Sequence, residues 1–404
     1  MTMTLAAKYC HRLSVVLCSL TLFFTLCGLF IVPLGPHYLT NLLVFSSVVG
    51  VINYFVGNKT LVGVSARNLY WCVIIYIIAI GISRLVHDDE SWLIRNLLYI
   101  LAFFLLMPRE PVLVNAFKLG SLVGGIAIGL LAVWQYHNGM LRVEGFTNAI
   151  LFAQGALILA ILNSFFAQES STVLTRYSYI VSAMFAISAI YFSQSRGVWL
   201  ALIVVVTFVL FAKAIKEPIK YLSWFLILSC VLAITFYESD ILRARIHESI
   251  SEVNMLESNN YTSSWGLRLM AWKSAWAGFV GDPLLGVGLD GFKAMQQQQL
   301  QDGIVNDFYV SFGMYHAHNQ FMQNMVIRGI VGLLAALAIL VYPMRLFWHQ
   351  SKLVSVGFII TLGTFVCALT DVPIEHQNTL YIYLISLFVI FFKNEGRFND
   401  KVAS

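Results

Sequence analysis

The sequence predicts an all-α, polytopic integral membrane protein of about twelve transmembrane helices, with one long, partly helical loop on the outer side. Of its 404 residues, 59% are hydrophobic and only 11% are charged, and the mean hydropathy is +0.78. A soluble protein of this length needs more polar surface. The apolar runs are each about 17 to 25 residues long, the length of a helix that crosses the hydrocarbon core.

The chain divides into three regions. Residues 1–238 hold nine expected spans, at 12–32, 38–57, 69–86, 91–107, 112–134, 146–168, 175–193, 196–214 and 220–238. Residues 239–318 form the long hydrophilic loop, which is expected to carry part of an active site. Residues 319–404 hold three further spans, at 319–342, 354–370 and 377–392, and a short tail.

Orientation follows from Lys and Arg, which collect in cytoplasmic loops. An even number of spans puts both termini on one side. If that side is the cytoplasm, the inner segments hold most of the basic residues: Lys8, Arg12, Lys59, Arg67, Arg109, Arg176, Lys213, Lys216, Lys220, Arg345, Lys352, Lys393, Arg397 and Lys401. The short outer loops hold only Arg84, Arg142 and Arg196. The prediction is therefore cytoplasmic termini and an outer loop that is periplasmic in a Gram-negative inner membrane. The net charge of +5 reflects this orientation and not a nucleic-acid surface.

Arg196 lies in the polar tip 193–197 between two apolar runs, in the first turn of the eighth expected helix. An Arg at an outer helix N-terminus opposes both the positive-inside bias and the helix dipole. A bound anion would relieve both. The alternative is a side chain that reaches to the lipid headgroups.

Arg268 lies on an expected helix of the outer loop, at the edge of an apolar stripe formed by Trp265, Leu269, Trp272 and Trp276. The spacing of four, three and four residues predicts a helical face that lies on the membrane or over a cavity. Arg268 is either a ligand-binding cation there or a solvated surface residue.

His316 and His318 immediately precede the tenth expected span, which carries Gly329 and Gly332 on one face, where a neighbouring helix is able to pack closely. Two histidines at this spacing could hold a metal, but no third ligand has convincing spacing. We therefore expect no metal site and no cofactor. The remaining alternative for His318 is a hydrogen-bonded surface group.

Three other outer residues are weaker candidates. Arg142 could touch a phosphate or a glycan, although Glu144 is close enough to neutralise it. Asp371, in the outer turn 370–376, is either a general base or a turn residue. Arg245 is expected to be a solvated loop charge.

His318 and Asn319, followed after nine residues by Gly329 and then Gly332, together with Arg196 and the long outer loop, resemble the bacterial O-antigen ligase family. This family belongs to a superfamily with O-antigen polymerases and protein O-oligosaccharyltransferases. The resemblance implies metal-independent transfer of a glycan from undecaprenyl diphosphate at the periplasmic face. For a ligase, the acceptor is the lipid A-core oligosaccharide of lipopolysaccharide.

The chemistry of that transfer suits the candidate residues. Negative charge builds on the departing diphosphate, and Arg196 and Arg268 are predicted to stabilise it because an Arg fork binds phosphate oxygens and stays charged. Arg142 is an additional substrate contact. His318 is the predicted general base for the acceptor hydroxyl, and Asn319 is predicted to orient a sugar or phosphate. A single displacement would invert the anomeric carbon.

Three alternatives remain. A polymerase or a protein O-oligosaccharyltransferase would use the same donor, and the His-Asn element favours the ligase. A flippase or another transporter should show charges in mid-membrane or an internal repeat. Only Arg95 and Arg328 approach that description, and both are interpreted as structural.

Overall fold

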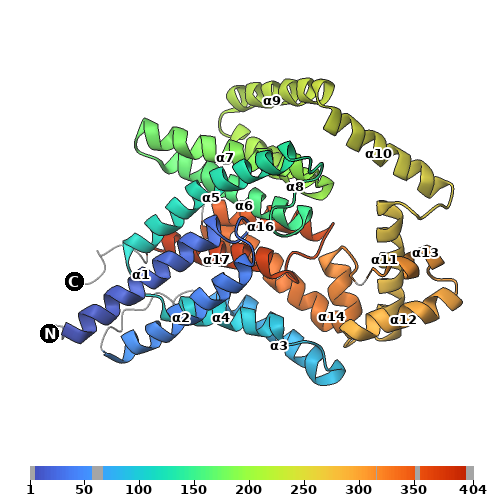
Figure 1. Ribbon diagram of the computed structural model, residues 1–404, viewed down its shortest axis with the longest axis horizontal. Coiled ribbons are helices and arrows are strands. Elements are labelled where there is room, and N and C mark those ends of the chain that lie inside the picture. The colour runs from blue at the N-terminus through green and yellow to red at the C-terminus, as the bar shows by residue number, and fades with distance from the viewer. Residues whose placement is uncertain (1–4, 57–66, 315, 351–354, 397–404) are drawn as a thin grey trace.

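The computed structural model describes residues 5–56, 67–314, 316–350 and 355–396. All the main elements of this part of the chain are helices (Figure 1). Nine helices precede the outer loop: α1 (Leu5–Cys27), α2 (Gly35–Val56), α3 (Arg67–His87), α4 (Trp92–Leu106), α5 (Pro111–His137), α6 (Ala149–Glu169), α7 (Val173–Ser193), α8 (Arg196–Ala214) and α9 (Pro218–Glu238). Four follow it: α14 (Gln320–Leu340), α15 (Tyr342–Gln350), α16 (Val356–Ala368) and α17 (Gln377–Asn394). Lys59, Lys352, Arg397 and Lys401 lie outside the described residues.

The all-α, multi-pass membrane class is confirmed. Among the described residues, nine helical segments are long and apolar enough to cross a membrane: α1, α2, α3, α5 to α9, and α14 with most of α15. The other three expected spans are helices as well, but α4 has 15 residues and α16 only 13. The total of about twelve crossings therefore stays a prediction.

The last helix, α17, is the centre of the bundle. Nearly all of its 18 residues are buried, and it packs against α4, α6 and α16. The first turn of α17 is polar, which lowers the mean hydropathy of the helix. The polar side chains of this turn form hydrogen bonds within the bundle. Gln377 donates to Thr40 Oγ1 at 2.9 Å, and Thr379 donates to the His376 carbonyl at 3.2 Å.

The long loop folds into four helices, α10 (Asp240–Glu257), α11 (Ser264–Gly281), α12 (Leu289–Gln301) and α13 (Asp307–Phe312). The side chains of Ser239, Ser263 and Asn306 cap α10, α11 and α13 by accepting backbone N–H bonds. In Figure 1, α11, α12 and α13 lie together beside the start of α14. The stripe expected on α11 is not its packing face, because Trp265 and Trp276 are exposed while Leu267, Met270, Ala271, Ser274 and Ala275 are buried.

α14 is kinked at Gly329, where φ is +61°. The sequence predicted a continuous helix with another helix packed on its glycine face, and that detail is wrong. A turn of the outer loop packs there instead, because a Cβ on Gly329 would lie 2.3 Å from the Leu284 backbone. The kink frees main-chain groups that the turn then binds: Val287 N donates to Val326 O at 2.8 Å, and Ile330 N donates to Pro283 O at 2.8 Å.

Candidate active site

Two histidines lie at the start of α14 on a fixed stretch of backbone. Between them, Ala317 is buried, its N–H donates to Gln323 Oε1 at 2.8 Å, and its carbonyl accepts from Trp272 Nε1 at 2.9 Å. His318 has a left-handed backbone, with φ at +46°, which residues other than glycine rarely adopt. Helices α11 and α14 therefore hold His316 and His318 in place, with ring centroids 4.0 Å apart.

A buried carboxylate faces His318. Nδ1 of His318 lies 3.4 Å from Oδ1 of Asp371, and Gln154 Nε2 of α6 donates to Oδ2 of the same carboxylate at 3.0 Å. Burial alone raises the pKa of Asp371, but its contact with His318 and the other nearby histidines outweighs burial and lowers it. Asp371 is therefore an ionised partner for the Nδ1 side of His318.

The turn that carries Asp371 is fixed against two helices. A Cβ on Gly197 would lie 2.2 Å from Thr370 Oγ1, so the glycine lets α8 approach this turn closely. Asn319 Nδ2 donates to the Leu369 carbonyl at 3.2 Å, while its Oδ1 caps α14 by accepting two backbone N–H bonds. Both polar ends of Asn319 thus bind the protein, and its contact with substrate stays a prediction.

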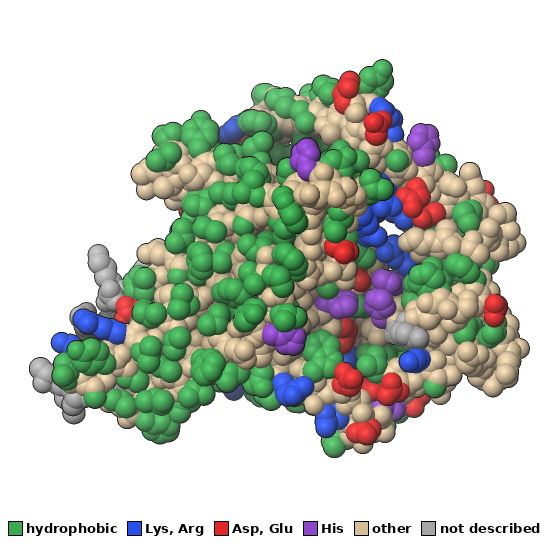
Figure 2. Space-filling view, in the orientation of Figure 1, with side chains coloured by type: hydrophobic (Ala, Val, Ile, Leu, Met, Phe, Trp, Pro, Cys, Tyr) green, Lys and Arg blue, Asp and Glu red, His purple; other side chains and the backbone are tan. Residues whose placement is uncertain are grey.

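A basic cavity of about 290 Å³ opens beside His318. Four arginines from separate elements line it: Arg142 from the turn before α6, Arg196 from α8, Arg245 from α10 and Arg268 from α11. Figure 2 shows Lys and Arg side chains gathered in a hollow between the bundle and the loop helices, with His side chains beside them. The structure thus brings together Arg142, Arg196, Arg268 and His318, which the sequence singled out separately.

Arg196 is already paired. Its guanidinium donates to Ser249 Oγ at 2.9 Å and to Glu252 Oε1 at 3.0 Å, and the Glu252 side chain is only 6% exposed. Both partners lie on α10, so Arg196 ties that helix to α8. Its charge is partly neutralised before any ligand binds.

Arg268 has a different environment. No residue of the described chain forms a hydrogen bond or an ion pair with it. Burial lowers the pKa of Arg268; the charge of Asp371 raises it, and that of Arg196 lowers it again. The side chain nevertheless stays protonated, as Arg does in proteins. A largely buried guanidinium with free N–H groups is a ready site for an anion.

Arg142 and Arg245 complete the basic cavity. Arg142 Nε donates to the Ser193 carbonyl at 3.2 Å, and burial together with the charges of the other three arginines lowers its pKa. Arg245 Nε donates to Gln194 Oε1 at 3.0 Å. The expectation that Arg245 is a solvated loop charge is therefore wrong, since it lines the cavity. Four cations in one cavity repel one another and favour a ligand with more than one negative charge.

The structure supplies the third potential metal ligand that the sequence did not offer. Ligand atoms of His316, His318 and Asp371 all lie within 4.8 Å of one another. Burial and the charge of His318 lower the pKa of His316 to about 4, so its ring is neutral. However, Asp371 already binds Gln154, and the positive charge of Arg268 acts on both His316 and Asp371. The absence of a metal ion from this cluster therefore stays a prediction.

Arg328 is confirmed as a buried residue with a structural ion pair. Its guanidinium donates to Glu375 Oε1 at 2.7 Å and to Asn324 Oδ1 at 2.8 Å, and Tyr76 OH donates to the same Glu375 oxygen at 2.6 Å. Arg95 is exposed on α4. Neither arrangement resembles a chain of mid-membrane charges.

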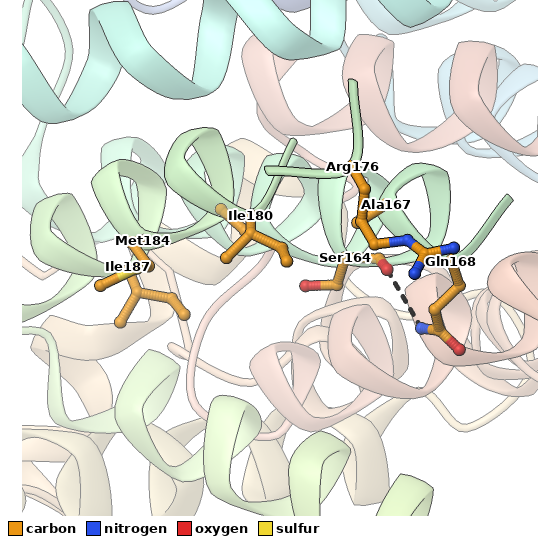
Figure 3. Close-up of a pocket in the computed structure, with 8 residues that line it drawn as sticks. Ser164, Ala167, Gln168, Arg176, Ile180, Met184 and Ile187 are labelled. Carbon is orange, nitrogen blue, oxygen red and sulfur yellow. Dashed lines mark hydrogen bonds between the residues drawn. The ribbon is translucent and has the colours of Figure 1, made fainter. Parts of the chain in front are cut away.

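A larger hollow of about 550 Å³ is lined by the last turns of α6 and by residues 176–187 of α7 (Figure 3). Its wall is mainly apolar, from Ile180, Met184 and Ile187. The polar residues at its rim are Arg176 and Gln168, and Gln168 donates to the Ser164 carbonyl at 3.0 Å. It contains no acid or base suited to catalysis, so the basic cavity remains the candidate site.

Three site residues were missed from the sequence: Gln154, Arg245 and Glu252. A signal existed for the last two, because Arg245, Ser249 and Glu252 are spaced by four and three residues and so share one helix face. For Gln154 no signal existed, since its contact with Asp371 spans 217 residues of the chain.

The helices and this cavity define a multi-pass membrane protein with a polar site that combines a histidine–carboxylate pair and clustered arginines. Residues 181–337 match the protein-family model described as O-Antigen ligase. This match confirms the resemblance of residues 181–337 to the O-antigen ligase family. The matched region runs from α7 into α14 and includes Arg196, Arg268 and His318, whereas Arg142 and Asp371 lie outside it.

A relative from Haemophilus influenzae is 25% identical over 338 residues, which cover 78% of this chain and 81% of the relative. It carries the description "Uncharacterized protein". The similarity therefore extends over most of both chains without adding a statement of function.

Proposed function

We propose that this protein is an O-antigen ligase, which transfers O-antigen polysaccharide from undecaprenyl diphosphate to lipid A-core oligosaccharide at the periplasmic face of the bacterial inner membrane. The observation that carries the proposal is the basic cavity that opens on His318, itself paired with Asp371. A diphosphate leaving group needs the positive charge of the basic cavity, and a hydroxyl nucleophile needs a base such as His318.

The reaction is a single displacement at the anomeric carbon. The acceptor hydroxyl gives its proton to His318 as its oxygen bonds to that carbon, and the bond to the diphosphate oxygen breaks with its electron pair leaving on the diphosphate. Nδ1 of His318 faces the Asp371 carboxylate, which favours a proton on Nδ1 and leaves Nε2 to act as base. Attack from the face opposite the diphosphate inverts the carbon.

The arginines act on the leaving diphosphate. Arg268 lies in the cavity with donors that no residue of the described chain occupies, so it binds the diphosphate as charge develops. Arg196, Arg142 and Arg245 supply further positive charge, and Arg196 exchanges part of its bonding with Glu252 for the ligand. This division of roles makes the residues of the cavity the leaving-group site.

The first experiment is the lipopolysaccharide profile of a deletion strain with and without the wild-type gene, run beside an assay of undecaprenyl-linked polymer. A ligase predicts loss of polymer-capped lipopolysaccharide in the deletion strain and accumulation of long carrier-linked polymer. Collapse of the polymer to single repeats would instead identify a polymerase. Normal lipopolysaccharide with loss of a glycan from proteins would identify a protein O-oligosaccharyltransferase.

Transfer is expected to be independent of metal ions, because the four arginines of the basic cavity supply the positive charge that a metal ion would otherwise bring to the diphosphate. Purified protein dialysed against EDTA should keep its transfer rate within about twofold, since no charge is removed from the leaving-group site. Added Mg²⁺, Mn²⁺ or Zn²⁺ should not raise the rate. A large loss on dialysis that one of these ions restores would contradict the assignment.

A further inference from the structure

A second cavity, of about 240 Å³, lies on the other side of the two histidines. It shares no lining residue with the basic cavity, but the two meet at the histidines, because His316 lines the second cavity and His318 lines the basic one. Their ring centroids are 4.0 Å apart. A group bound in each cavity would therefore approach the other at this histidine pair.

The two cavities carry opposite charge. Four arginines and Glu248 line the basic cavity, which gives a formal charge of +3 with neutral histidines. Three carboxylates and one arginine line the second cavity, which gives −2: Asp89, Glu90, Glu375 and Arg328. In Figure 2, Asp and Glu side chains lie beyond the histidines, on the side away from the gathered basic side chains. A diphosphate is attracted to the first cavity and repelled from the second.

Two of the three carboxylates serve the fold. Asp89 accepts from Ser83 Oγ at 2.6 Å and from the Leu289 N–H at the start of α12 at 2.8 Å. Glu375 accepts from Arg328 and Tyr76. Glu90 differs from both, because its side chain is exposed and the described chain offers it no hydrogen bond or ion pair.

Besides Glu90, an arginine and a tryptophan line the cavity. Arg328 is 93% buried, since only 7% of its surface is exposed, and its Nε has no hydrogen-bond partner among the described residues. Trp92, the first residue of α4, presents an indole ring to the same space. A carboxylate acceptor, an N–H donor and an aromatic ring are what a sugar ring needs, because its hydroxyls both donate and accept while its C–H face packs on an aromatic side chain.

We propose that the second cavity is the acceptor subsite, and that it holds the uncharged sugar ring whose hydroxyl attacks the donor. The assignment rests on the proposed function. The acceptor hydroxyl is presented from this side to the histidine pair, while the diphosphate is held among the arginines on the other side. The cavity is the size of a single sugar ring and not of an oligosaccharide, so it selects the terminal acceptor sugar, and the charge of −2 disfavours a phosphorylated one.

The test is Glu90→Gln in purified, full-length protein, with an undecaprenyl-diphosphate-linked glycan as donor and lipid A-core as acceptor. The variant keeps the size of the side chain and leaves the Asp89 and Glu375 networks untouched. The KM for lipid A-core should rise about tenfold, the effect of weakening a hydrogen bond to a charged group. The KM for the donor, and binding of undecaprenyl diphosphate alone, should not change.

Asp88→Asn is the matched control. Asp88 is an exposed carboxylate two residues away that does not line either cavity, and its φ of +57° is one that Asn tolerates. Its loss of charge should leave both KM values unchanged. An unchanged acceptor KM in Glu90→Gln would overturn the acceptor subsite, as would a rise in the donor KM alone. If wild-type protein binds undecaprenyl diphosphate but transfers nothing to lipid A-core, the ligase function itself fails, and the acceptor assignment fails with it.

Discussion

Replacing Arg268 by alanine is expected to lower the rate of glycan transfer by about a hundredfold to a thousandfold, which is the usual loss when one preorganised donor to a developing anion is removed. Among the described residues, Arg268 is the one cavity arginine to which no other residue forms a hydrogen bond or an ion pair, so its charge is the most available to the diphosphate. The measurement is kcat with purified protein and a carrier-linked glycan. Arg268→Lys should recover only part of the rate, because an ammonium lacks the planar fork.

The matched control is Lys273→Ala on the same helix. Lys273 is exposed and lies over the Tyr261 ring, outside the basic cavity. Its removal should leave kcat unchanged. Full activity of Arg268→Ala, at normal protein level in the membrane, would remove Arg268 from the mechanism.

Arg196→Ala is expected to lower the transfer rate as well, but it needs a second variant to be interpreted. Its removal also leaves the buried Glu252 carboxylate unpaired, which is costly and adds negative charge beside the cavity. Combining Arg196→Ala with Glu252→Gln removes that charge. A rate that stays low in the double variant assigns the loss to the missing cation, whereas full recovery assigns it to the unpaired carboxylate.

Replacing His318 is expected to lower kcat by about a hundredfold to ten-thousandfold, the range for loss of a general base. His318→Asn is the sharper variant, because Asn tolerates the left-handed backbone that this position requires and so separates chemistry from strain. Binding of undecaprenyl diphosphate should persist. His247→Ala, at an exposed position on α10, is the control and should be fully active.

The same measurement separates His318 from Asp371. The lowered pKa of Asp371 makes its carboxylate a weak proton acceptor, and its 3.4 Å contact with Nδ1 of His318 favours a positioning role over that of the base. Asp371→Asn should therefore lose less rate than His318→Asn, because the general base itself is kept. An active His318→Asn beside a dead Asp371→Asn would make Asp371 the base.

The sequence predicted the parts of this site that depend on local pattern. Arg196 and His318 are candidates because each lies where an apolar span is expected to begin. Arg268 is a candidate because it borders an aromatic stripe. What it could not predict depends on contacts between distant segments. The sequence leaves Asp371 open as a base or a turn residue, because its neighbours in the chain do not reveal that Gln154 and His318 contact its carboxylate.

The fold followed the same rule. Apolar length located the helices, but it did not show that α17, with its polar first turn, is the buried centre. The sequence indicates a helix-packing face at Gly329, where the structure has a kink. A glycine allows either close packing or a positive φ, and only the segment that packs against it decides which.

The main-chain bonds that join the turn 283–288 to α14 also bear on how a substrate reaches the site. Because these bonds do not depend on side chains, they hold α11 to α13 against the membrane bundle. These three helices are therefore poorly suited to move aside when a substrate enters. α10 is attached differently, through the side chains of Arg196 and Arg245. These are the same cations that a diphosphate attracts, so a bound diphosphate would compete with Ser249, Glu252 and Gln194 for the two side chains that hold α10.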